Sequence, residues 1–336
     1  MPICPPPRHN PSDPEAEDAV MIKLDPAQFA KSAVSDETRA FNETLEAALK
    51  DMPPTHTIPP EVTRRAREEG KGLFPMHGPL DGSEWREIDF GGMVRVTPSP
   101  RPKATGVYFH VHGGGWTIGS PAYHDRQNQA IAKATGAAVV SVRYRLAPEH
   151  PWPDGPDDVM NAARWLIENA NAEFGTDRIA MGGESAGGHL CAVALLRLRD
   201  EGLLGHIHGA VFNYGCFDLR MTASMKNWGP RPLILSTPTV AWFADNFTPD
   251  AAIRSDPIAS PLLAELSGMP PALFQIGTSD PLMDDSLQMV ARWAGAGLDA
   301  RLAIYPGGVH AFDMFDLAIA REAHAATHAF LAEIFG

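Results

Sequence analysis

The chain has 336 residues, of which 44% are hydrophobic and 21% are charged, and its formal net charge is −13 at pH 7. This is the composition of a globular protein, and a chain of this length can bury about three quarters of the surface that it exposes when unfolded. Because an acidic protein repels phosphate backbones, we expect no nucleic acid partner.

The N-terminal residues 1–20 are rich in proline and acidic side chains, which predicts a flexible tail. They contain no apolar signal-peptide segment, and no apolar run in the chain approaches the roughly 18 residues that a membrane span requires. The three cysteines, Cys4, Cys191 and Cys216, are an odd and widely spaced set, which is typical of a reducing compartment. We therefore expect a cytoplasmic protein without a membrane span, with Cys191 in the core.

Two helices are predicted ahead of any strand. Residues 35–50 place apolar side chains at helical spacing, and either Ser35 or Asp36 can cap the start of this helix. A proline-rich stretch ends it, and a second, short helix is predicted over 61–70. Because both helices precede the strands, they can cover a structure that forms later in the chain.

From about residue 85 the pattern becomes one of short strands alternating with helices. Strands are predicted over 85–90, 93–97, 106–112, 137–143, 178–181, 208–214, 272–277 and 301–305, and helices over 125–134, 157–169, 186–199, 286–294 and 317–334. This alternation predicts an α/β fold with a mostly parallel sheet and helices on both faces. Residues 217–260, rich in Trp, Met and Pro, interrupt the alternation and predict an insertion over one end of the sheet.

The segment GGESAGG, residues 182–188, contains a G-x-S-x-G motif centred on Ser185. It follows a predicted strand and opens an apolar helix, which is the context of a nucleophile elbow. The alternative is a glycine-rich turn of a nucleotide-binding domain. The chain has no G-x-G-x-x-G with a following acidic residue and no G-x-x-x-x-G-K-[ST], so we interpret Ser185 as a nucleophile.

Three consecutive glycines follow the strand predicted over 106–112. Their backbone can approach a reacting group closely and present N–H donors to an oxyanion. We predict that the donors are the N–H groups of Gly114, Gly115 and Ala186, with Gly113 as the alternative.

The two histidines of this strand, His110 and His112, form an H-x-H pair that could ligate a metal. No carboxylate or third histidine follows them at ligand spacing. We therefore expect no metal site.

Two further polar residues follow late strands at the same edge of the predicted sheet. Asp280 follows the strand at 272–277 and His310 follows the strand at 301–305, and the carboxyl ends of parallel strands share one edge. We predict that Asp280 orients His310 and that His310 is the general base. Asp284 and Asp285 are rival acids that we expect to cap a helix or support the site. Core or surface roles are expected for three other histidines, His189, His324 and His328.

At these motifs the sequence resembles the hormone-sensitive-lipase-like esterases, the bacterial family IV carboxylesterases of the α/β-hydrolase superfamily. The segments YRLAPEHP at 144–151 and DPL at 280–282 also match this family, and the resemblance covers about residues 80–335. It implies the α/β-hydrolase fold with Ser185, Asp280 and His310 as a catalytic triad.

The resemblance also implies a cap built from the N-terminal helices and the insertion at 217–260. The chain would then divide into a tail with cap helices, residues 1–80, and a catalytic domain, residues 81–336. The implied activity is hydrolysis of short- to medium-chain acyl esters through an acyl-enzyme. A small-molecule ester is the expected partner, no cofactor is required, and a homodimer is common in the family.

The sequence departs from the family pattern at two positions. Glu184 precedes the nucleophile where the family usually has Asp or Thr, which leaves the hydrogen bonding of the elbow open. Ala311 stands where many members carry Gly. For the YRLAPEHP segment we predict a structural role, that of fixing the chain after its strand.

Aromatic residues beside the motifs are candidates for the walls of a substrate pocket, with core packing as the alternative for each. Trp116, Tyr214 and Phe312 adjoin the motifs, and we favour Trp116 because it follows the three glycines. Further candidates lie in the insertion: Trp228, Trp242 and Phe243.

Two other functions are compatible with this fold. A ligand receptor can derive from such an enzyme by loss of the triad histidine, but His310 is present. Hydrolysis of small amides would use the same triad.

Overall fold

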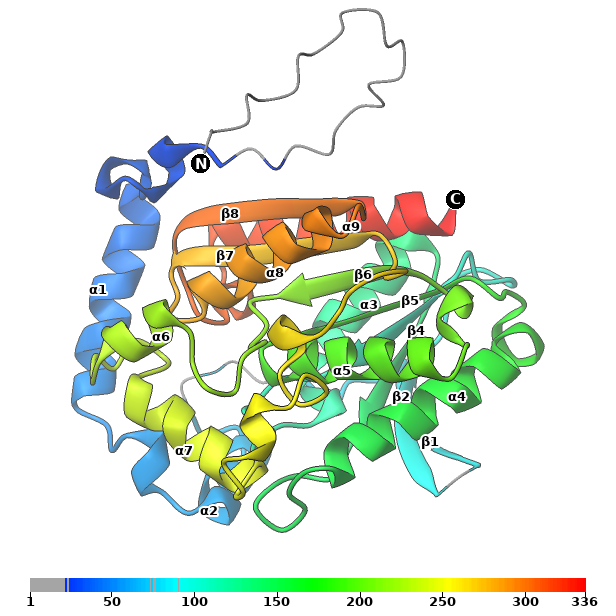
Figure 1. Cartoon of the computed structure of the whole chain (residues 1–336), viewed down its shortest axis with the longest axis horizontal. Helices are drawn as coiled ribbons and strands as arrows, with labels where there is room; N and C mark the ends of the chain where they lie inside the picture. The colour runs from blue at the N-terminus through cyan, green and yellow to red at the C-terminus, as the bar shows by residue number, and fades with distance from the viewer. Residues whose placement is uncertain (1–21, 23, 73, 75–76, 90) are drawn as a thin grey trace, which may run out of the picture.

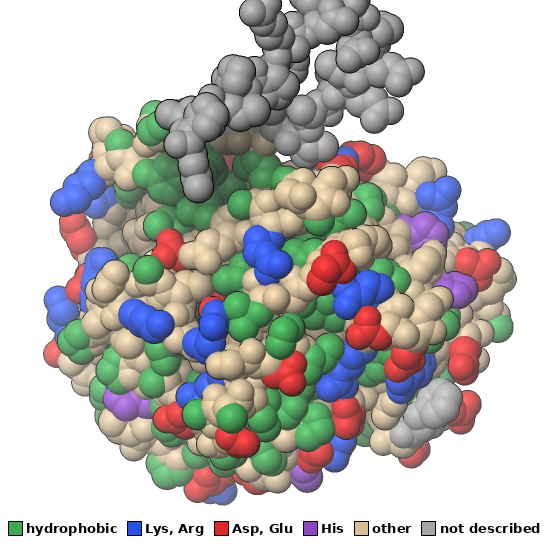
Figure 2. Space-filling model, viewed as in Figure 1, with side chains coloured by type: hydrophobic (Ala, Val, Ile, Leu, Met, Phe, Trp, Pro, Cys, Tyr) green, Lys and Arg blue, Asp and Glu red, His purple; other side chains and the backbone are tan. Residues whose placement is uncertain are grey.

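A computed structural model of the chain describes residues 22, 24–72, 74, 77–89 and 91–336 (Figure 1). The tail predicted over 1–20, including Cys4, lies outside these residues. In the part described, no helix is both long enough and apolar enough to cross a membrane. On the face shown in Figure 2, Lys and Arg side chains are interspersed with Asp and Glu.

The core of the molecule is an eight-stranded sheet with the strand order β1-β2-β4-β3-β5-β6-β7-β8. The strands are β1 Glu84–Ile88, β2 Gly92–Thr97, β3 Val107–Val111, β4 Ala138–Arg143, β5 Ile179–Glu184, β6 Ile207–Asn213, β7 Ala272–Ser279 and β8 Ala300–Val309. β2 is antiparallel to both of its neighbours, and the strands from β4 to β8 run parallel. The predicted α/β fold with a mostly parallel sheet is confirmed.

Helices cover both faces of this sheet (Figure 1). One face carries α3 Asp125–Thr135 and α9 Ala318–Phe335, and the other carries α4 Asp154–Phe174, α5 Ala186–Asp200 and α8 Met283–Gly295. Successive strand residues point to opposite faces, so Val139 packs with α3 and α9 whereas Val140 packs with α4 and α5. Both residues are fully buried, which explains the continuous apolar runs in the strands.

Four further helices lie beside the α/β core, on the left and lower left of Figure 1. They are α1 Asp36–Lys50, α2 Pro60–Glu68, α6 Ala223–Trp228 and α7 Thr237–Phe247. Ser35 caps α1, since its hydroxyl accepts a hydrogen bond from the N–H of Thr38 at 3.2 Å. The insertion contacts α1, because Arg231, in the loop between α6 and α7, pairs with Glu46 at 2.8 Å.

Some element bounds differ from those predicted. The helix predicted over 157–169 begins at Asp154, because Pro156 falls in its first turn, where a helix does not need the missing N–H. The strand predicted over 178–181 continues to Glu184, since its glycines pair with both β3 and β6. Cys191 is fully buried in α5, as predicted.

Candidate active site

Ser185 lies at a sharp turn between β5 and α5. Its φ and ψ of 56° and −120° are unusual for a residue with a side chain. The turn is closed so tightly against β3 that a Cβ at Gly183 or Gly187 would come within 2.2 Å or 1.9 Å of the Val111 carbonyl oxygen. Only glycine fits at these two positions, which explains the G-x-S-x-G spacing in steric terms.

Hydrogen bonds join the three residues that the sequence predicted as a triad. His310 Nε2 lies 2.9 Å from Ser185 Oγ, and His310 Nδ1 lies 2.9 Å from Asp280 Oδ2. The Asp280 carboxylate also accepts the Leu282 N–H at 2.8 Å, and it is 2% exposed. The structure therefore brings Ser185, His310 and Asp280 together from three different strand ends, in the order required for nucleophile, base and orienting acid.

The rival acids occupy supporting positions. Asp285 accepts hydrogen bonds from the N–H groups of Phe217 and Asp218 and from the Thr222 hydroxyl, at 2.6, 3.0 and 2.6 Å. Burial raises the pKa of its carboxyl to about 7, although these donors oppose the shift. Asp285 therefore holds the loop after β6 beneath the site, and it forms no hydrogen bond with His310.

The glycine loop after β3 follows a path that side chains would obstruct. Gly114 has a φ of 114°, and a Cβ there would come within 1.7 Å of the Ile118 carbonyl oxygen. Gly115 has a φ of 57°, and a Cβ there would come within 2.4 Å of the Phe243 ring. The N–H of Gly113, the alternative donor, is already bonded to the Glu184 carboxylate at 2.7 Å. The N–H groups of Gly114 and Gly115 have no hydrogen-bond acceptor in the described part of the chain.

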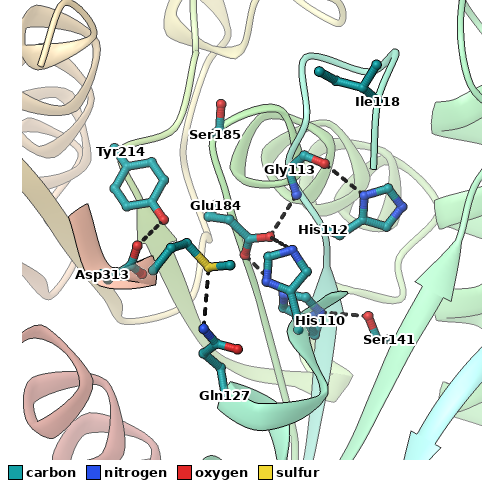
Figure 3. A network of polar contacts seen from close by, with 12 residues as sticks. His110, His112, Gly113, Ile118, Gln127, Ser141, Glu184, Ser185, Tyr214 and Asp313 are labelled. Carbon is teal, nitrogen blue, oxygen red and sulfur yellow. Dashed lines mark hydrogen bonds and ion pairs between the residues drawn. The ribbon is translucent and has the colours of Figure 1, made fainter. Parts of the chain in front are cut away.

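Glu184 lies at the centre of a buried polar network (Figure 3). One carboxylate oxygen accepts the Gly113 N–H and lies 3.1 Å from His124 Nε2, and the other lies 3.0 Å from His110 Nε2. The chain continues from His110 Nδ1 to the Ser141 hydroxyl at 2.6 Å. Ser185 points away from this network, so the adjacent side chains of Glu184 and Ser185 lie in different surroundings.

The protonation of this network follows from its donors. Burial opposes ionisation of Glu184, but His124, His110 and the Gly113 N–H together lower its pKa to about 2. Burial lowers the pKa of His124 to about 4. At neutral pH Glu184 is therefore a carboxylate and His124 is neutral.

The network bears on the expectation that no metal binds. The ligand atoms of His110, His124 and Glu184 lie within 4.8 Å of one another, so a carboxylate and another histidine do approach His110 in space. Spacing along the chain does not reveal this cluster, because its residues come from separate segments. The donor set does not fit a metal as it stands, since both oxygens of Glu184 already accept N–H bonds. His112 lies apart, with Nδ1 bonded to the Gly113 carbonyl oxygen at 2.8 Å.

The YRLAPEHP segment holds the glycine loop from behind. The Tyr144 hydroxyl donates to the His112 carbonyl oxygen at 2.8 Å, and the Ala147 N–H donates to the Trp116 carbonyl oxygen at 2.9 Å. Arg64 of α2 pairs with Glu149 of the segment through two contacts of 2.8 Å. These contacts support the structural role predicted for this segment.

A cavity of about 120 Å³ opens in front of Ser185. Trp116 and Tyr214, two of the predicted wall residues, line it. Trp116 is also held in the core, because its Nε1–H donates to His189 Nδ1 at 3.0 Å and its ring stacks on Phe247. Of the candidates in the insertion, Phe243 lines the cavity.

Phe312 lies outside the lining of this cavity. It packs in the core against Tyr305, with ring centroids 5.0 Å apart, because the chain turns at Ala311 with a φ of 58°. Sequence reasoning missed other lining residues: Thr55, Arg67, Phe74, Tyr123, His124, Ile234 and Leu235. No motif marks them, because their orientation depends on how the peripheral helices pack.

The chain is similar to known proteins of one family. Residues 108–314 match a family described as having the alpha/beta hydrolase fold. The chain is 35% identical over 298 residues to the carboxylesterase NlhH of Mycobacterium tuberculosis, a match that covers 85% of this chain and 92% of that protein. It is 34% identical over 220 residues to an ethyl acetate hydrolase of Pseudomonas putida, covering 64% of this chain and 69% of that protein.

Solved structures show the same similarity. A hyperthermophilic esterase from the archaeon Pyrobaculum calidifontis superposes with a TM-score of 0.80 at 30% identity, over 88% of this chain and 97% of that chain. A hormone-sensitive lipase from a metagenome library superposes with a TM-score of 0.77 at 27% identity, over 89% of this chain and 98% of that chain.

Proposed function

Because the chain belongs to the alpha/beta hydrolase fold family and is a carboxylesterase of its hormone-sensitive-lipase-like group, we propose that it cleaves short- to medium-chain acyl esters through Ser185, His310 and Asp280. The observation that carries the proposal is the continuous chain of 2.9 Å contacts from Ser185 Oγ through His310 to Asp280. This chain of contacts faces the cavity in front of Ser185, and Gly114, Gly115 and Ala186 also line that cavity.

The proposed reaction follows from these positions. The Ser185 hydroxyl oxygen attacks the ester carbonyl carbon while His310 Nε2 accepts the hydroxyl proton, and Asp280 holds the imidazole in the required tautomer. The N–H groups of Gly114, Gly115 and Ala186 stabilise the oxyanion. His310 then returns the proton to the leaving alcohol, and an acyl-enzyme remains. Water, deprotonated by His310, releases the acid and restores Ser185.

Glu184 has a positioning role in this proposal. Its carboxylate fixes the Gly113 N–H at 2.7 Å, so Gly113 is unavailable as an oxyanion donor and Gly114 and Gly115 supply the loop's two donors. The anchor keeps the loop in one conformation before the substrate arrives, which is how preorganised donors lower a barrier.

We further propose that α1, α2, α6 and α7, with the segments that link them, form the cap over the catalytic domain. Ile234, Val240 and Phe243 of the insertion line the cavity together with Ser185. Their apolar side chains and the modest volume of about 120 Å³ favour short acyl chains. This supports the division into cap segments, within 1–80 and about 217–260, and a catalytic domain within 81–336.

Hydrolysis of p-nitrophenyl esters from acetate to palmitate tests the proposal, with wild type beside Ser185→Ala. We expect turnover of the short esters, its loss in the variant, and labelling of wild type alone by a fluorophosphonate. A folded wild type that turns over none of these esters would instead favour the receptor function. Matched anilides test amide hydrolysis. The homodimer and the cytoplasmic location stay predictions, and light scattering tests the first.

A further inference from the structure

A second cavity, within the cap, adjoins the cavity in front of Ser185. The second has a volume of about 420 Å³ and lies between α2, the end of α1 and the segment that leads into α7. Six residues line both cavities: Thr55, Arg67, Phe74, Ile234, Leu235 and Thr239. A ligand that reaches from Ser185 towards the cap would therefore pass Arg67.

Arg67 lacks an acidic partner in the described part of the chain. No carboxylate oxygen there lies within 4.0 Å of its guanidinium nitrogens, and its one polar contact is 3.5 Å from Nη1 to the Ile118 carbonyl oxygen. The guanidinium also lies 5.2 Å from the centre of the Phe74 ring. Arg64, on the same helix, instead makes two contacts of 2.8 Å with Glu149. Arg64 therefore stabilises the fold, whereas most N–H donors of Arg67 have no acceptor in the described part of the chain.

The surroundings of Arg67 favour a negatively charged ligand. The lining of the second cavity contains the cations Arg67 and Lys71 and no Asp or Glu. Lys71 is bonded to Glu69 at 2.8 Å, so Arg67 is the cation without compensation. In the first cavity, the carboxylate of Glu184 is already held by His110, His124 and Gly113.

The desolvation of Arg67 also favours binding of an anion. Burial lowers the pKa of Arg67 to about 10, so it keeps its charge at neutral pH at the expense of solvation. Arg67 is half-buried. A cation that is partly withdrawn from water without a partner is destabilising, and an anion that binds it removes part of that penalty. Guanidinium groups bind carboxylates through two parallel hydrogen bonds.

Resting on the function proposed above, we propose that the enzyme prefers esters that carry a carboxylate at the end remote from the scissile bond, and that Arg67 binds this carboxylate. An apolar chain between the ester and the carboxylate would lie along Phe74, Ile234 and Leu235. Two kinds of substrate have this chemistry: half-esters of dicarboxylic acids, with the charge on the acyl side, and esters of hydroxy acids, with the charge on the alcohol side.

Two matched substrate pairs test the proposal. On the acyl side, mono-4-nitrophenyl adipate is compared with 4-nitrophenyl hexanoate. On the alcohol side, 6-acetoxyhexanoate is compared with hexyl acetate, by release of acetate. For each pair the ratio of kcat/KM, charged over neutral, is measured in wild type, Arg67→Gln and Arg67→Lys. The ratio cancels any general effect of a variant on folding or on the chemical step.

We expect Arg67→Gln to lower the ratio about 10- to 100-fold for at least one pair, as for the loss of hydrogen bonds to a charged group. Arg67→Lys should restore part of it, because the charge returns without the planar fork. The matched control is Arg65→Gln, which removes an exposed cation from the same helix and should change the ratio less than about twofold.

An unchanged ratio in Arg67→Gln for both pairs would overturn this inference while leaving the proposed function intact, provided that the neutral esters are hydrolysed and Ser185→Ala abolishes their hydrolysis. A wild type that hydrolyses no ester of either pair would overturn both. The side on which the preference appears identifies the class of substrate.

Discussion

At the carboxyl end of the sheet, Ser185, His310 and Asp280 form a continuous chain of hydrogen bonds, and both oxygens of Glu184 are bonded to N–H groups. We call these residues, with the glycine loop 112–116, the catalytic floor. The proposed cap, which faces this floor across the cavity, is built differently. It presents the apolar side chains of Ile234, Val240 and Phe243.

The difference separates two tasks within one cavity. The proposed reacting groups in the floor are joined to one another by hydrogen bonds, so their geometry is defined before a substrate binds. Cap contacts are mostly apolar and depend on size and shape, so they can select a substrate without moving the reacting atoms. Changes in the floor should therefore lower kcat, and changes in the cap should alter the preference among substrates.

The largest expected effect is that of Asp280→Asn in the floor. The amide would present its NH2 group to His310 Nδ1 and favour the wrong tautomer, so we expect kcat to fall by about 10³- to 10⁴-fold with little change in KM. Asp284→Asn is the control, since Asp284 bonds the Ser224 N–H rather than His310. A loss of less than tenfold in Asp280→Asn would show that Asp280 does not orient the base.

The next effect is that of Glu184→Gln, which leaves one acceptor oxygen where the network uses two. We expect kcat to fall by about 10- to 100-fold, and KM to change by less than about threefold, because Gly113 loses its fixed position and the oxyanion donors lose their order. Glu149→Gln is the control, since it removes a carboxylate that pairs with Arg64 of the cap. Equal losses in the two variants would contradict a special role for Glu184.

A smaller effect concerns stability against pH. Burial lowers the pKa of His189 to about 4, below its usual 6.5, although the hydrogen bond that the ring donates to the Ala259 carbonyl oxygen opposes the shift. The neutral ring also accepts the Trp116 Nε1–H. Between pH 4 and pH 6.5 the unfolded chain binds more protons at this residue than the folded chain does. The contribution of His189 to the free energy of unfolding is therefore fully present above pH 6.5 and falls as the pH drops towards 4.

Melting curves at pH 7 and pH 5 measure this effect. We expect His189 to contribute about 2 kcal/mol to the loss of unfolding free energy. His189→Gln should therefore show a correspondingly smaller loss over this range. A variant whose stability depends on pH as steeply as that of wild type would exclude His189 as a source.

The smallest expected effect lies in the cap. Phe243→Leu withdraws the ring that lies against Gly115, and the space gained should admit about one further methylene. We expect the ratio of kcat/KM for octanoate over acetate to rise about fourfold, from ~0.8 kcal/mol for each methylene that is buried. Trp242→Leu is the control, because Trp242 does not line the cavity. An equal fall in kcat for all esters would contradict the separate roles of cap and floor.

The floor could be predicted from the sequence because its residues stand at strand ends. Asp280 and His310 each follow a strand of a parallel sheet, so topology alone brings them to the same edge as Ser185. The sheet itself was predictable for a similar reason, since residues such as Val139 and Val140 are apolar in succession. The exact bounds of the strands could not be predicted, because the glycines in β5 pair according to their neighbours rather than their own propensity.

The contacts that could not be predicted join segments without a repeating pattern. His124 lies 60 residues before Glu184, ahead of a helix whose entry angle sets the direction of the imidazole. The inward orientation of Arg67 rather than Arg65 depends on how α2 packs against the insertion. For Phe312, a pocket wall and core packing were both compatible with its position beside His310, and the left-handed turn at Ala311 directs it into the core.

The contact between Glu184 and the Gly113 N–H has a consequence for protein engineering. The nucleophile turn and the glycine loop are separated by 71 residues, yet one carboxylate bridges them at 2.7 Å. An elbow transplanted from a relative with aspartate would fall short by one methylene, and the loop would lose its anchor. Libraries that recombine such enzymes should therefore inherit positions 110, 113, 124 and 184 as a single block.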